Sequence, residues 1–186
     1  MAMKAAVDID GVVADQIPPI LQIISERFKR IAIKDQIIHY SFSDSLGLPP
    51  GSDRIIIDEY NRTRLLSAPP IRGALVGLED LRRLFDIHLV TSRPQSTEQA
   101  TSSWLAEHGF VFDKIHFIEH ALKAEFIATS GFHLAIEDAG DIAVESADKG
   151  INTFLMNAPW NQSAEHSRLY RVESWEEIIT VANTLV

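Results

Sequence analysis

Lys4-Ala5-Ala6-Val7-Asp8-Ile9-Asp10-Gly11-Val12-Val13 is the stretch that decides the fold class. Its apolar start is typical of a buried strand, and two acids follow at the point where that strand ends. Ligands of open parallel sheets bind beyond the carboxyl ends of the strands, so Asp8 and Asp10 stand where a site belongs. Two carboxylates this close repel each other, and a Mg²⁺ ion would relieve that repulsion. The alternatives are a turn with capping Asp side chains, or a calcium loop, which helices rather than a strand would flank.

Further along the chain, short apolar runs alternate with segments whose apolar residues have helical spacing. This alternation predicts a parallel sheet covered on both faces by helices, which is an α/β, Rossmann-like fold. The strands are expected at residues 4–7, 87–90, 115–118, 134–136 and 153–156. Ser174 and Glu177 form a capping-box pattern, which predicts the start of one more helix.

One long interval, from residue 16 to residue 70, contains no good strand pattern. Its apolar residues recur at helical spacing, and turn-forming runs rich in proline separate the helical segments. We therefore expect an α/β core made of residues 1–15 and 71–186. A small helical subdomain, residues 16–70, is expected as an insertion after the first strand.

The composition narrows the class of partner. The 186 residues carry 17 Lys and Arg against 26 Asp and Glu, a net charge of −9, and they include no cysteine. The acidic balance argues against a nucleic-acid polymer, while a small phosphorylated metabolite stays compatible if a cation offsets the charge. Disulfides and thiolate metal sites are excluded. No apolar run reaches the length that spans a membrane, and residues 1–5 do not resemble a signal peptide, so we expect a cytoplasmic enzyme.

Polar side chains also follow two later strands. Thr91-Ser92-Arg93 follows the second strand, where a hydroxyl, a backbone N–H and a guanidinium can hold a phosphoryl oxygen. Glu137-Asp138 follows the fourth strand, and two adjacent acids there need a metal or a basic partner if they are buried. Taken singly these signals are weak, because Ser and Thr often cap helices and a lone lysine such as Lys123 is normally solvated.

The order of the motifs carries more information than the separate pieces. Asp8-Ile9-Asp10-Gly11, then Thr91-Ser92, then Lys123, then Glu137-Asp138 resembles the haloacid dehalogenase (HAD) superfamily of phosphotransferases. The resemblance covers the whole chain, and the insertion after the first motif is similar to the C1 helical cap of that superfamily. Residues 8–15 and residues 69–94 resemble the 5′(3′)-deoxyribonucleotidases and their bacterial relatives. The resemblance implies a Mg²⁺-dependent phosphomonoester hydrolase, acting as a 5′-nucleotidase on nucleoside monophosphates.

The resemblance also implies a role for each matching residue. Asp8 would attack phosphorus and form an aspartyl-phosphate. Asp10 would protonate the leaving ester oxygen and later take a proton from the hydrolytic water. Thr91 would hydrogen-bond a phosphoryl oxygen, and Lys123 would supply positive charge to the same group.

The metal ligands follow from the same resemblance. Mg²⁺ would be held by Asp8, by the backbone carbonyl of Asp10 and by Asp138. Glu137 would act through a bound water. The pair reads Glu-Asp rather than Asp-Asp, a variant that is also similar to sugar-phosphate members of the superfamily.

A further group of residues is expected to contact the substrate. The nucleotidases place aromatic residues around the base, and one of these directly follows the last Asp of the first motif, where this chain has Gln16. The residues expected to bind substrate are Ser92, Arg93, Tyr40 and Phe42. We expect Asp15, Arg93 and Asp141 either to contact the catalytic residues or the leaving group, or to form helix caps and surface ion pairs.

Several other classes of protein share part of this motif pattern. A sugar-phosphate phosphatase or a phosphomutase would use the same residues, and a non-catalytic phosphate-binding module would keep the fold without the nucleophile or the acid. A response-regulator receiver has its acidic pair near the start of the chain, whereas Glu137-Asp138 comes late. Residues 116–120, His-Phe-Ile-Glu-His, match the pattern of inverted zinc peptidases, which need both His residues on one helical face. The β-branched and aromatic composition of that segment favours a strand instead.

Overall fold

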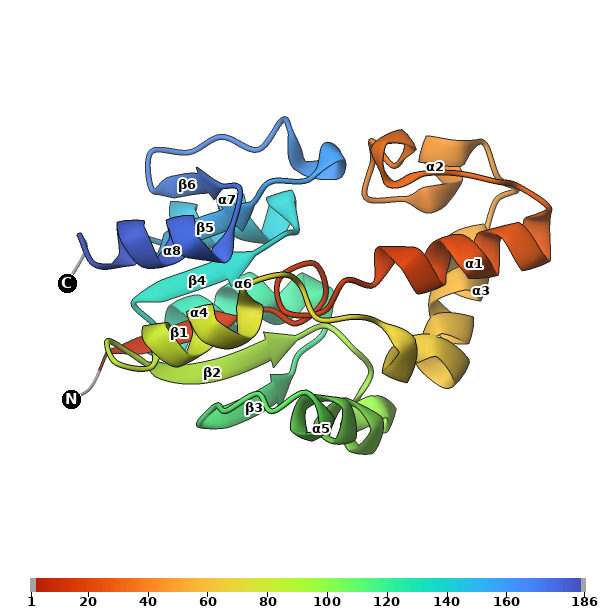
Figure 1. Ribbon diagram of the computed structural model, residues 1–186. Coiled ribbons are helices and arrows are strands. Elements are labelled where there is room, and N and C mark those ends of the chain that lie inside the picture. The colour runs from red at the N-terminus through yellow and green to blue at the C-terminus, as the bar shows by residue number, and fades with distance from the viewer. Residues whose placement is uncertain (1–2, 185–186) are drawn as a thin grey trace.

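A six-stranded sheet with all strands parallel forms the centre of the computed structural model, which describes residues 3–184. The strand order is β3-β2-β1-β4-β5-β6, so the chain builds one half of the sheet before it starts the other (Figure 1). The strands are β1 (Lys4–Val7), β2 (Asp86–Thr91), β3 (Lys114–Phe117), β4 (Leu134–Glu137), β5 (Asn152–Met156) and β6 (Leu169–Val172). The α/β, Rossmann-like fold predicted from the sequence is confirmed.

The two halves of the sheet meet between β1 and β4. Val7 of β1 pairs with Leu89 of β2 on one side and with Ile136 of β4 on the other. The strand order reverses at this place, and in open α/β sheets a crevice for ligands opens at such a switch point. The acids that follow β1 and β4 therefore lie at the crevice.

The sixth strand is the one that the sequence pattern did not predict. β6 pairs only with β5, at the edge of the sheet, and Arg171 interrupts its apolar run. The Arg171 guanidinium donates to the carbonyl oxygens of Asn161 and Ala164. A short edge strand with a polar residue engaged in this way has too little alternation to be recognised as a strand.

Helices cover both faces of the sheet, as the alternation of strands and helices predicted. Ala5 and Val7 point into the larger apolar core, which α4, α5 and α8 help to close, whereas Ala6 points into a second core closed by α6 and α7. α4 and α8 lie side by side on the near face in Figure 1. The helices of these layers are α4 (Ala74–Leu81), α5 (Glu98–Glu107), α6 (His120–Thr129), α7 (Gly140–Asp148) and α8 (Trp175–Ala182).

The last helix begins where the capping-box pattern placed it. Ser174 accepts a hydrogen bond from the Glu177 N–H at 3.3 Å. The Glu177 carboxylate accepts from the Glu173 N–H rather than from Ser174, so the box closes one residue earlier than in its usual form. Within residues 3–184, no helix has the combination of length and apolar character that crossing a membrane requires.

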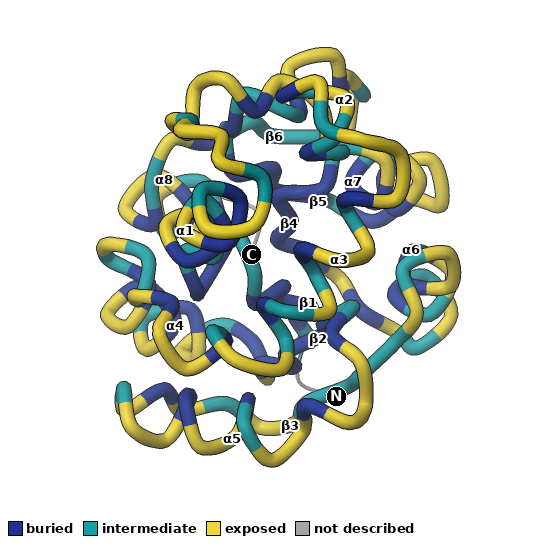
Figure 2. Tube along the Cα trace, turned by 90° about the vertical axis from the view of Figure 1, so that its right-hand side faces the viewer, coloured by how far each residue is buried: buried dark blue, intermediate teal, exposed yellow. Residues whose placement is uncertain are grey.

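The segment between β1 and α4 is helical, as predicted, and lies beyond the carboxyl ends of the strands (Figure 1). Its helices are α1 (Ile17–Phe28), α2 (Phe42–Leu46) and α3 (Ser52–Glu59), and a π-helical turn, Tyr60–Arg64, continues α3. Figure 2 looks onto this insertion and shows buried segments of α1 alternating with exposed ones. The buried positions of α1, among them Ile20, Ile23 and Ile24, join the larger core of the sheet.

Two adjacent stretches of chain connect the insertion to the sheet. The Asp15 N–H donates to the Pro69 carbonyl at 2.8 Å, and the Ile71 N–H donates to the Val13 carbonyl at 2.8 Å. Because these connections are hydrogen-bonded to each other, the insertion enters and leaves the core at a single place. The domain boundaries at residues 15/16 and 70/71 stay sequence-based predictions.

Candidate active site

The loop after β1 brings the first acidic pair to the crevice. The Ile9 carbonyl accepts from the Val13 N–H at 2.8 Å and from the Ala14 N–H at 2.7 Å, which winds the chain into one tight turn. Gly11 inside this turn has φ +79°, a left-handed conformation that favours glycine. A Cβ at Gly11 would overlap the Asp138 carboxylate, so glycine is required here both by the backbone and by the acid that it contacts.

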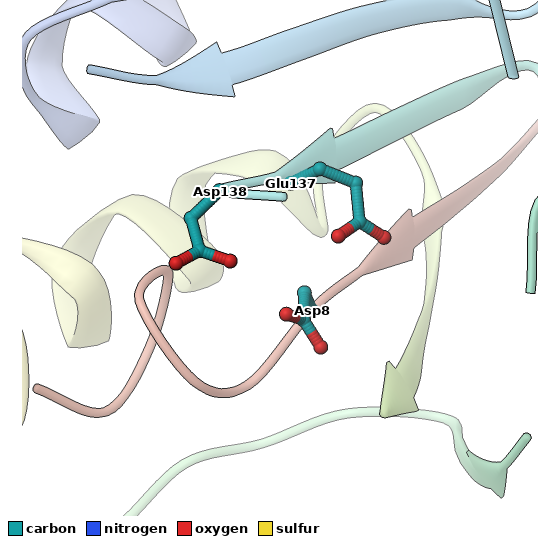
Figure 3. A group of neighbouring side chains, drawn as sticks. All are labelled: Asp8, Glu137 and Asp138. Atoms are coloured by element: carbon teal, nitrogen blue, oxygen red, sulfur yellow. The ribbon is translucent and has the colours of Figure 1, made fainter. Parts of the chain in front are cut away.

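Asp8, Glu137 and Asp138 lie together at the ends of β1 and β4, with the carboxylates of Glu137 and Asp138 turned toward Asp8 (Figure 3). One carboxylate oxygen from each of them lies within 4.8 Å of the other two. Lys123 reaches this cluster from α6, with its Nζ 2.7 Å from Asp8 Oδ1 and 2.9 Å from Glu137 Oε1. All four side chains are buried. Residues far apart in the sequence therefore converge in one place.

The cluster contains more negative charge than one lysine can balance. Burial raises the pKa of all three carboxyl groups above their usual values, because an ionised carboxylate loses its water here. The Lys123 ammonium opposes this effect, while for Asp138 the neighbouring Asp8 charge adds to it. Burial lowers the pKa of Lys123, but Asp8 and Glu137 outweigh it, and the pKa is raised. Lys123 is therefore protonated, and the cluster still lacks positive charge.

The unpartnered oxygens of this cluster fit a hard divalent cation. Glu137 Oε2 and Asp138 Oδ2 are buried without a hydrogen-bond partner among the described residues. Buried carboxylate oxygens in native proteins are normally paired or bind a metal. Three carboxylates around one point form an all-oxygen donor set, which suits Mg²⁺. Of the residues predicted as metal ligands, Asp8, Glu137 and Asp138 are brought together, and Asp10 lies in the turn that follows Asp8.

Thr91 and Ser92 lie at the end of β2, next to the carboxylate cluster. Thr91 Oγ1 accepts from the Arg93 N–H at 3.2 Å, and the Ser92 hydroxyl is buried without a hydrogen-bond partner among the described residues. Both residues line a cavity of about 200 Å³. Other predicted site residues on its wall are Asp8, Asp10, Arg93, Lys123, Asp138 and Tyr40.

The carboxylate of Asp10 pairs with a buried guanidinium. Arg93 Nε lies 2.7 Å from Asp10 Oδ2, and Arg93 Nη2 lies 2.7 Å from Asp10 Oδ1. The Tyr60 hydroxyl donates to Asp10 Oδ1 at 3.1 Å, and Thr101 Oγ1 accepts from Arg93 Nη1 at 3.2 Å. Arg93 was expected to contact the substrate, the leaving group or a catalytic residue, or to form a surface ion pair, and in the structure its buried guanidinium pairs with Asp10.

A second, mostly apolar cavity of about 320 Å³ adjoins the first. The two cavities share Gln16, Tyr40, Ile57 and Asp138 on their walls. Phe42 and Trp160 also line the apolar one, and the Trp160 N–H donates to the Asp138 carbonyl at 3.3 Å. Tyr40 and Phe42, the aromatic residues expected to bind substrate, therefore line a cavity that Asp138 of the carboxylate cluster also lines.

Two acids that the sequence singled out lie outside the cluster. Asp15 Oδ1 accepts from the Ile17 N–H at 3.2 Å, so it caps the start of α1. Asp141 Oδ2 lies 2.7 Å from His120 Nε2, and this hydrogen bond raises the pKa of His120 while it lowers that of Asp141. Of the roles expected for these two acids, Asp15 therefore caps a helix and Asp141 forms an ion pair with His120.

The zinc-peptidase pattern at residues 116–120 does not form a zinc site of that type. His116 lies on β3 and His120 begins α6, so the two residues do not share a helical face. His116 instead stacks on His88, and their Nε2 and Nδ1 atoms are 3.1 Å apart. The strand that the residue types favoured is the structure observed.

Sequence reasoning missed Tyr60 and Thr101 as parts of the site. Tyr60 lies at helical spacing after Ile56, and both residues are buried, so its spacing indicates only a core position. Thr101 lies in α5, where an isolated Thr has no pattern around it. Neither residue belongs to a motif, and only the fold brings them to Asp10.

Comparison with known proteins agrees with this geometry. Residues 2–185 match the family model described as 5′ nucleotidase, deoxy (Pyrimidine), cytosolic type C protein. “Putative nucleotidase BH1399” of Halalkalibacterium halodurans is 26% identical over 175 residues, which cover 94% of this chain and 89% of that protein.

Solved structures share the fold at low sequence identity. The haloacid dehalogenase-like family hydrolase SP0104 of Streptococcus pneumoniae superposes with a TM-score of 0.71 at 16% identity, covering 97% of this chain and 98% of that one. The “putative HAD-hydrolase YfnB” of Bacillus subtilis, a magnesium-bound structure, superposes with a TM-score of 0.65 at 16% identity, covering 98% and 100%. The chain therefore belongs to the cytosolic type C 5′-nucleotidase family, has the fold of the HAD-like hydrolases and is a phosphoric monoester hydrolase.

Proposed function

We propose that this protein hydrolyses nucleoside monophosphates in the presence of Mg²⁺, through an aspartyl-phosphate on Asp8. The observation that carries the proposal is the contact between its two cavities. One is lined by Asp8, Lys123 and Asp138, and the adjoining one is mostly apolar. A phosphoryl group suits the first cavity, and the flat ring of a nucleobase suits the second.

The first half of the reaction transfers the phosphoryl group to the protein. A carboxylate oxygen of Asp8 attacks phosphorus, the bond between phosphorus and the ester oxygen breaks, and Asp10 gives its proton to the departing oxygen. Thr91 and Ser92 lie on the same cavity wall, where their hydroxyl groups can hydrogen-bond phosphoryl oxygens. Lys123, held between Asp8 and Glu137, offsets the negative charge that develops.

The second half returns the protein to its starting state. A water molecule attacks phosphorus of the aspartyl-phosphate, and Asp10, now ionised, takes the proton that this water releases. The bond between phosphorus and Asp8 breaks, which frees inorganic phosphate and regenerates both carboxyl groups. Splitting one displacement into two steps lowers the barrier of each.

Asp8, Asp138 and the Asp10 backbone carbonyl would hold Mg²⁺, with Glu137 acting through a bound water, and the ion would supply positive charge to the phosphoryl group. The fit rests on the two unpartnered buried oxygens of Glu137 and Asp138. The chain has no cysteine, so it offers none of the thiolate ligands that softer metal ions prefer.

The apolar cavity supports a nucleotide rather than a sugar phosphate. Tyr40, Phe42 and Trp160 lie on its wall, and aromatic rings favour stacking on a base. Gln16 stands at its border with the phosphate cavity and offers an amide for hydrogen bonding. A hexose would instead require several polar groups, and the wall of this cavity is mostly apolar.

The deciding experiment is a phosphatase screen of nucleoside monophosphates and sugar phosphates, each with Mg²⁺ and with EDTA. We expect release of inorganic phosphate that requires Mg²⁺, with the highest kcat/KM for deoxypyrimidine monophosphates. A preference for a hexose phosphate would reject the nucleotidase assignment. Transfer of phosphate to a second position of a sugar, without release, would identify a mutase, and no turnover of any compound would favour a non-catalytic binding module.

A further inference from the structure

Asp10 is held by contacts that the reaction described above does not use. The Arg93 guanidinium faces it with two hydrogen bonds of 2.7 Å, one to each carboxylate oxygen. This two-point geometry fixes a carboxylate in orientation as well as in position. The side chain of Arg93 is 2% exposed and that of Asp10 is 17% exposed, so water competes little for these bonds.

The two partners of Asp10 come from different parts of the fold. Arg93 follows β2 in the core, and Thr101 of α5 accepts from its Nη1 at 3.2 Å, so the core holds the guanidinium. Tyr60 belongs to the insertion, where it opens the π-helical turn that continues α3. Its hydroxyl donates to Asp10 Oδ1 at 3.1 Å. Turns of this type are uncommon and are frequently found at functional sites.

The two oxygens of Asp10 are not equivalent in this arrangement. A carboxylate oxygen accepts about two hydrogen bonds, one for each lone pair. Oδ1 accepts from both Arg93 and Tyr60, whereas Oδ2 accepts from Arg93 alone among the described residues. Oδ2 therefore keeps an acceptor position, on a residue that lines the same cavity as Asp8 and Lys123.

We propose that Tyr60 and Arg93 are positioning residues, which hold Asp10 so that its Oδ2 exchanges the proton with the leaving oxygen. Tyr60 makes this orientation depend on the insertion lying against the core, so the acid is in place only when the insertion is in contact with the cavity. The inference rests on the proposed function, because it presumes that a leaving oxygen is protonated.

The proposal predicts an effect that depends on the leaving group. A 4-nitrobenzyl alkoxide needs a proton as the bond to phosphorus breaks, whereas a 4-nitrophenolate leaves without one. The two phosphate esters have similar size and shape, so a loss of binding or of folding would affect both. The ratio of their kcat/KM values therefore reports on proton delivery alone, because kcat/KM reflects events up to departure of the leaving group.

The test is the Tyr60→Phe variant, which removes one hydroxyl and keeps the ring. We expect kcat/KM for 4-nitrobenzyl phosphate to fall about tenfold, the size of one hydrogen bond, and kcat/KM for 4-nitrophenyl phosphate to stay within about twofold. Thr101→Val, which frees the Arg93 guanidinium on its other side, should give the same pattern with a smaller change. Tyr170→Phe is the matched control, since Tyr170 packs on Phe154 at the far edge of the sheet, and it should leave both values unchanged.

The possible outcomes separate the inference from the function on which it rests. Equal losses with both esters, or no loss with either, in a Tyr60→Phe protein of wild-type melting temperature would overturn the positioning role. If Tyr60→Phe does not fold, the ratio of the two kcat/KM values in Thr101→Val tests the positioning role instead. A wild-type protein that hydrolyses neither ester with Mg²⁺ overturns the proposed function, and the inference falls with it.

Discussion

The carboxyl edge of the sheet and the helical insertion contribute to the site in different ways. The sheet supplies charge, because Asp8, Glu137 and Lys123 are all buried where β1, β4 and α6 meet. The insertion supplies mostly apolar surface, and Tyr40 on it is 56% exposed. Charges in a fixed frame suit the chemical step, which needs little movement, whereas an exposed aromatic side chain suits recognition of a ligand.

The difference also separates two kinds of physical constraint. Around Asp8 an unbalanced buried charge must be met by a cation, so a change there alters stability and metal binding as well as activity. The insertion is held by the apolar core that it shares with the sheet, through residues such as Ile20 and Ile24. A change at an exposed residue of the apolar cavity wall, such as Tyr40, should therefore leave the chemistry and the fold almost untouched.

Asp8→Asn tests the role of the charged sheet edge in the chemical step and should have the largest effect on turnover. An amide is a poor nucleophile and forms no acyl phosphate here, so we expect kcat for 4-nitrophenyl phosphate with Mg²⁺ to fall by at least about a thousandfold. The measurement is release of 4-nitrophenolate at saturating substrate. Asp86→Asn, at an exposed position at the start of β2, is the control and should retain wild-type turnover. Turnover near wild type in Asp8→Asn would remove Asp8 from the reaction.

Asp138→Asn tests whether the charge at the sheet edge is there for a metal. Without metal the variant should be more stable than the wild type, because an unpartnered buried carboxylate becomes a neutral amide. With Mg²⁺ at about a hundred times its dissociation constant the wild type should gain about 2.7 kcal/mol, and the variant should lose most of that gain.

The measurement for Asp138→Asn is the melting temperature in EDTA and in MgCl₂. Asp35→Asn changes an exposed acid of the insertion and should shift with Mg²⁺ as the wild type does. A variant that is destabilised in EDTA and still gains the full shift in MgCl₂ would show that the sheet edge does not bind the ion through Asp138.

Much of the sheet edge was predictable because parallel strands convert sequence position into spatial position. A residue that directly follows a buried strand must lie at the carboxyl edge, and this places Asp8, Thr91 and Glu137 with no further information. Lys123 is different, because it lies in the first turns of α6 and points into the cluster only through helix packing. The family resemblance, rather than its position, indicated Lys123.

The insertion's contribution was less predictable because packing rather than strand direction sets it. Tyr40 and Phe42 were found from their residue type, yet the way Asp53 holds the Phe42 N–H, at 2.6 Å, has no sequence pattern. Tyr60 reads as a core residue, and its contact with Asp10 depends on a π-helical turn that helical periodicity does not indicate. The edge strand β6 was missed for a related reason, since Arg171 is engaged in tertiary contacts.

The pH dependence of stability also tests whether the sheet edge carries unbalanced buried charge. The pKa values of Glu137 and Asp138 are raised by burial, so between pH 4.5 and those raised values the folded protein binds more protons than the unfolded chain. Stability without metal should therefore fall as the pH rises above 4.5. Below the unfolded values both states are protonated, and the contribution is constant.

The stacked pair of His88, which is buried, and His116, which is half-buried, acts in the opposite sense below pH 6.5, because partial burial lowers the pKa of both. The measurement is therefore the difference in unfolding free energy between the wild type and Asp138→Asn, from urea titrations in EDTA at several pH values. The histidines contribute equally to both proteins and cancel. A difference that stays constant from pH 5 to pH 8 would mean that Asp138 does not titrate in this range.

Tyr40→Ala tests the role of the insertion in substrate recognition and should have the smallest effect on kcat. Loss of one stacking ring should raise KM for thymidine 5′-monophosphate about tenfold, with kcat within about twofold, because the ring contacts the base and not the reacting atoms. Its 56% exposure limits the loss of stability to about 0.5 kcal/mol. Tyr40→Phe keeps the ring and should have wild-type KM. A fall in kcat at unchanged KM would place Tyr40 in the chemical step, and the division of labour between sheet and insertion would then be wrong.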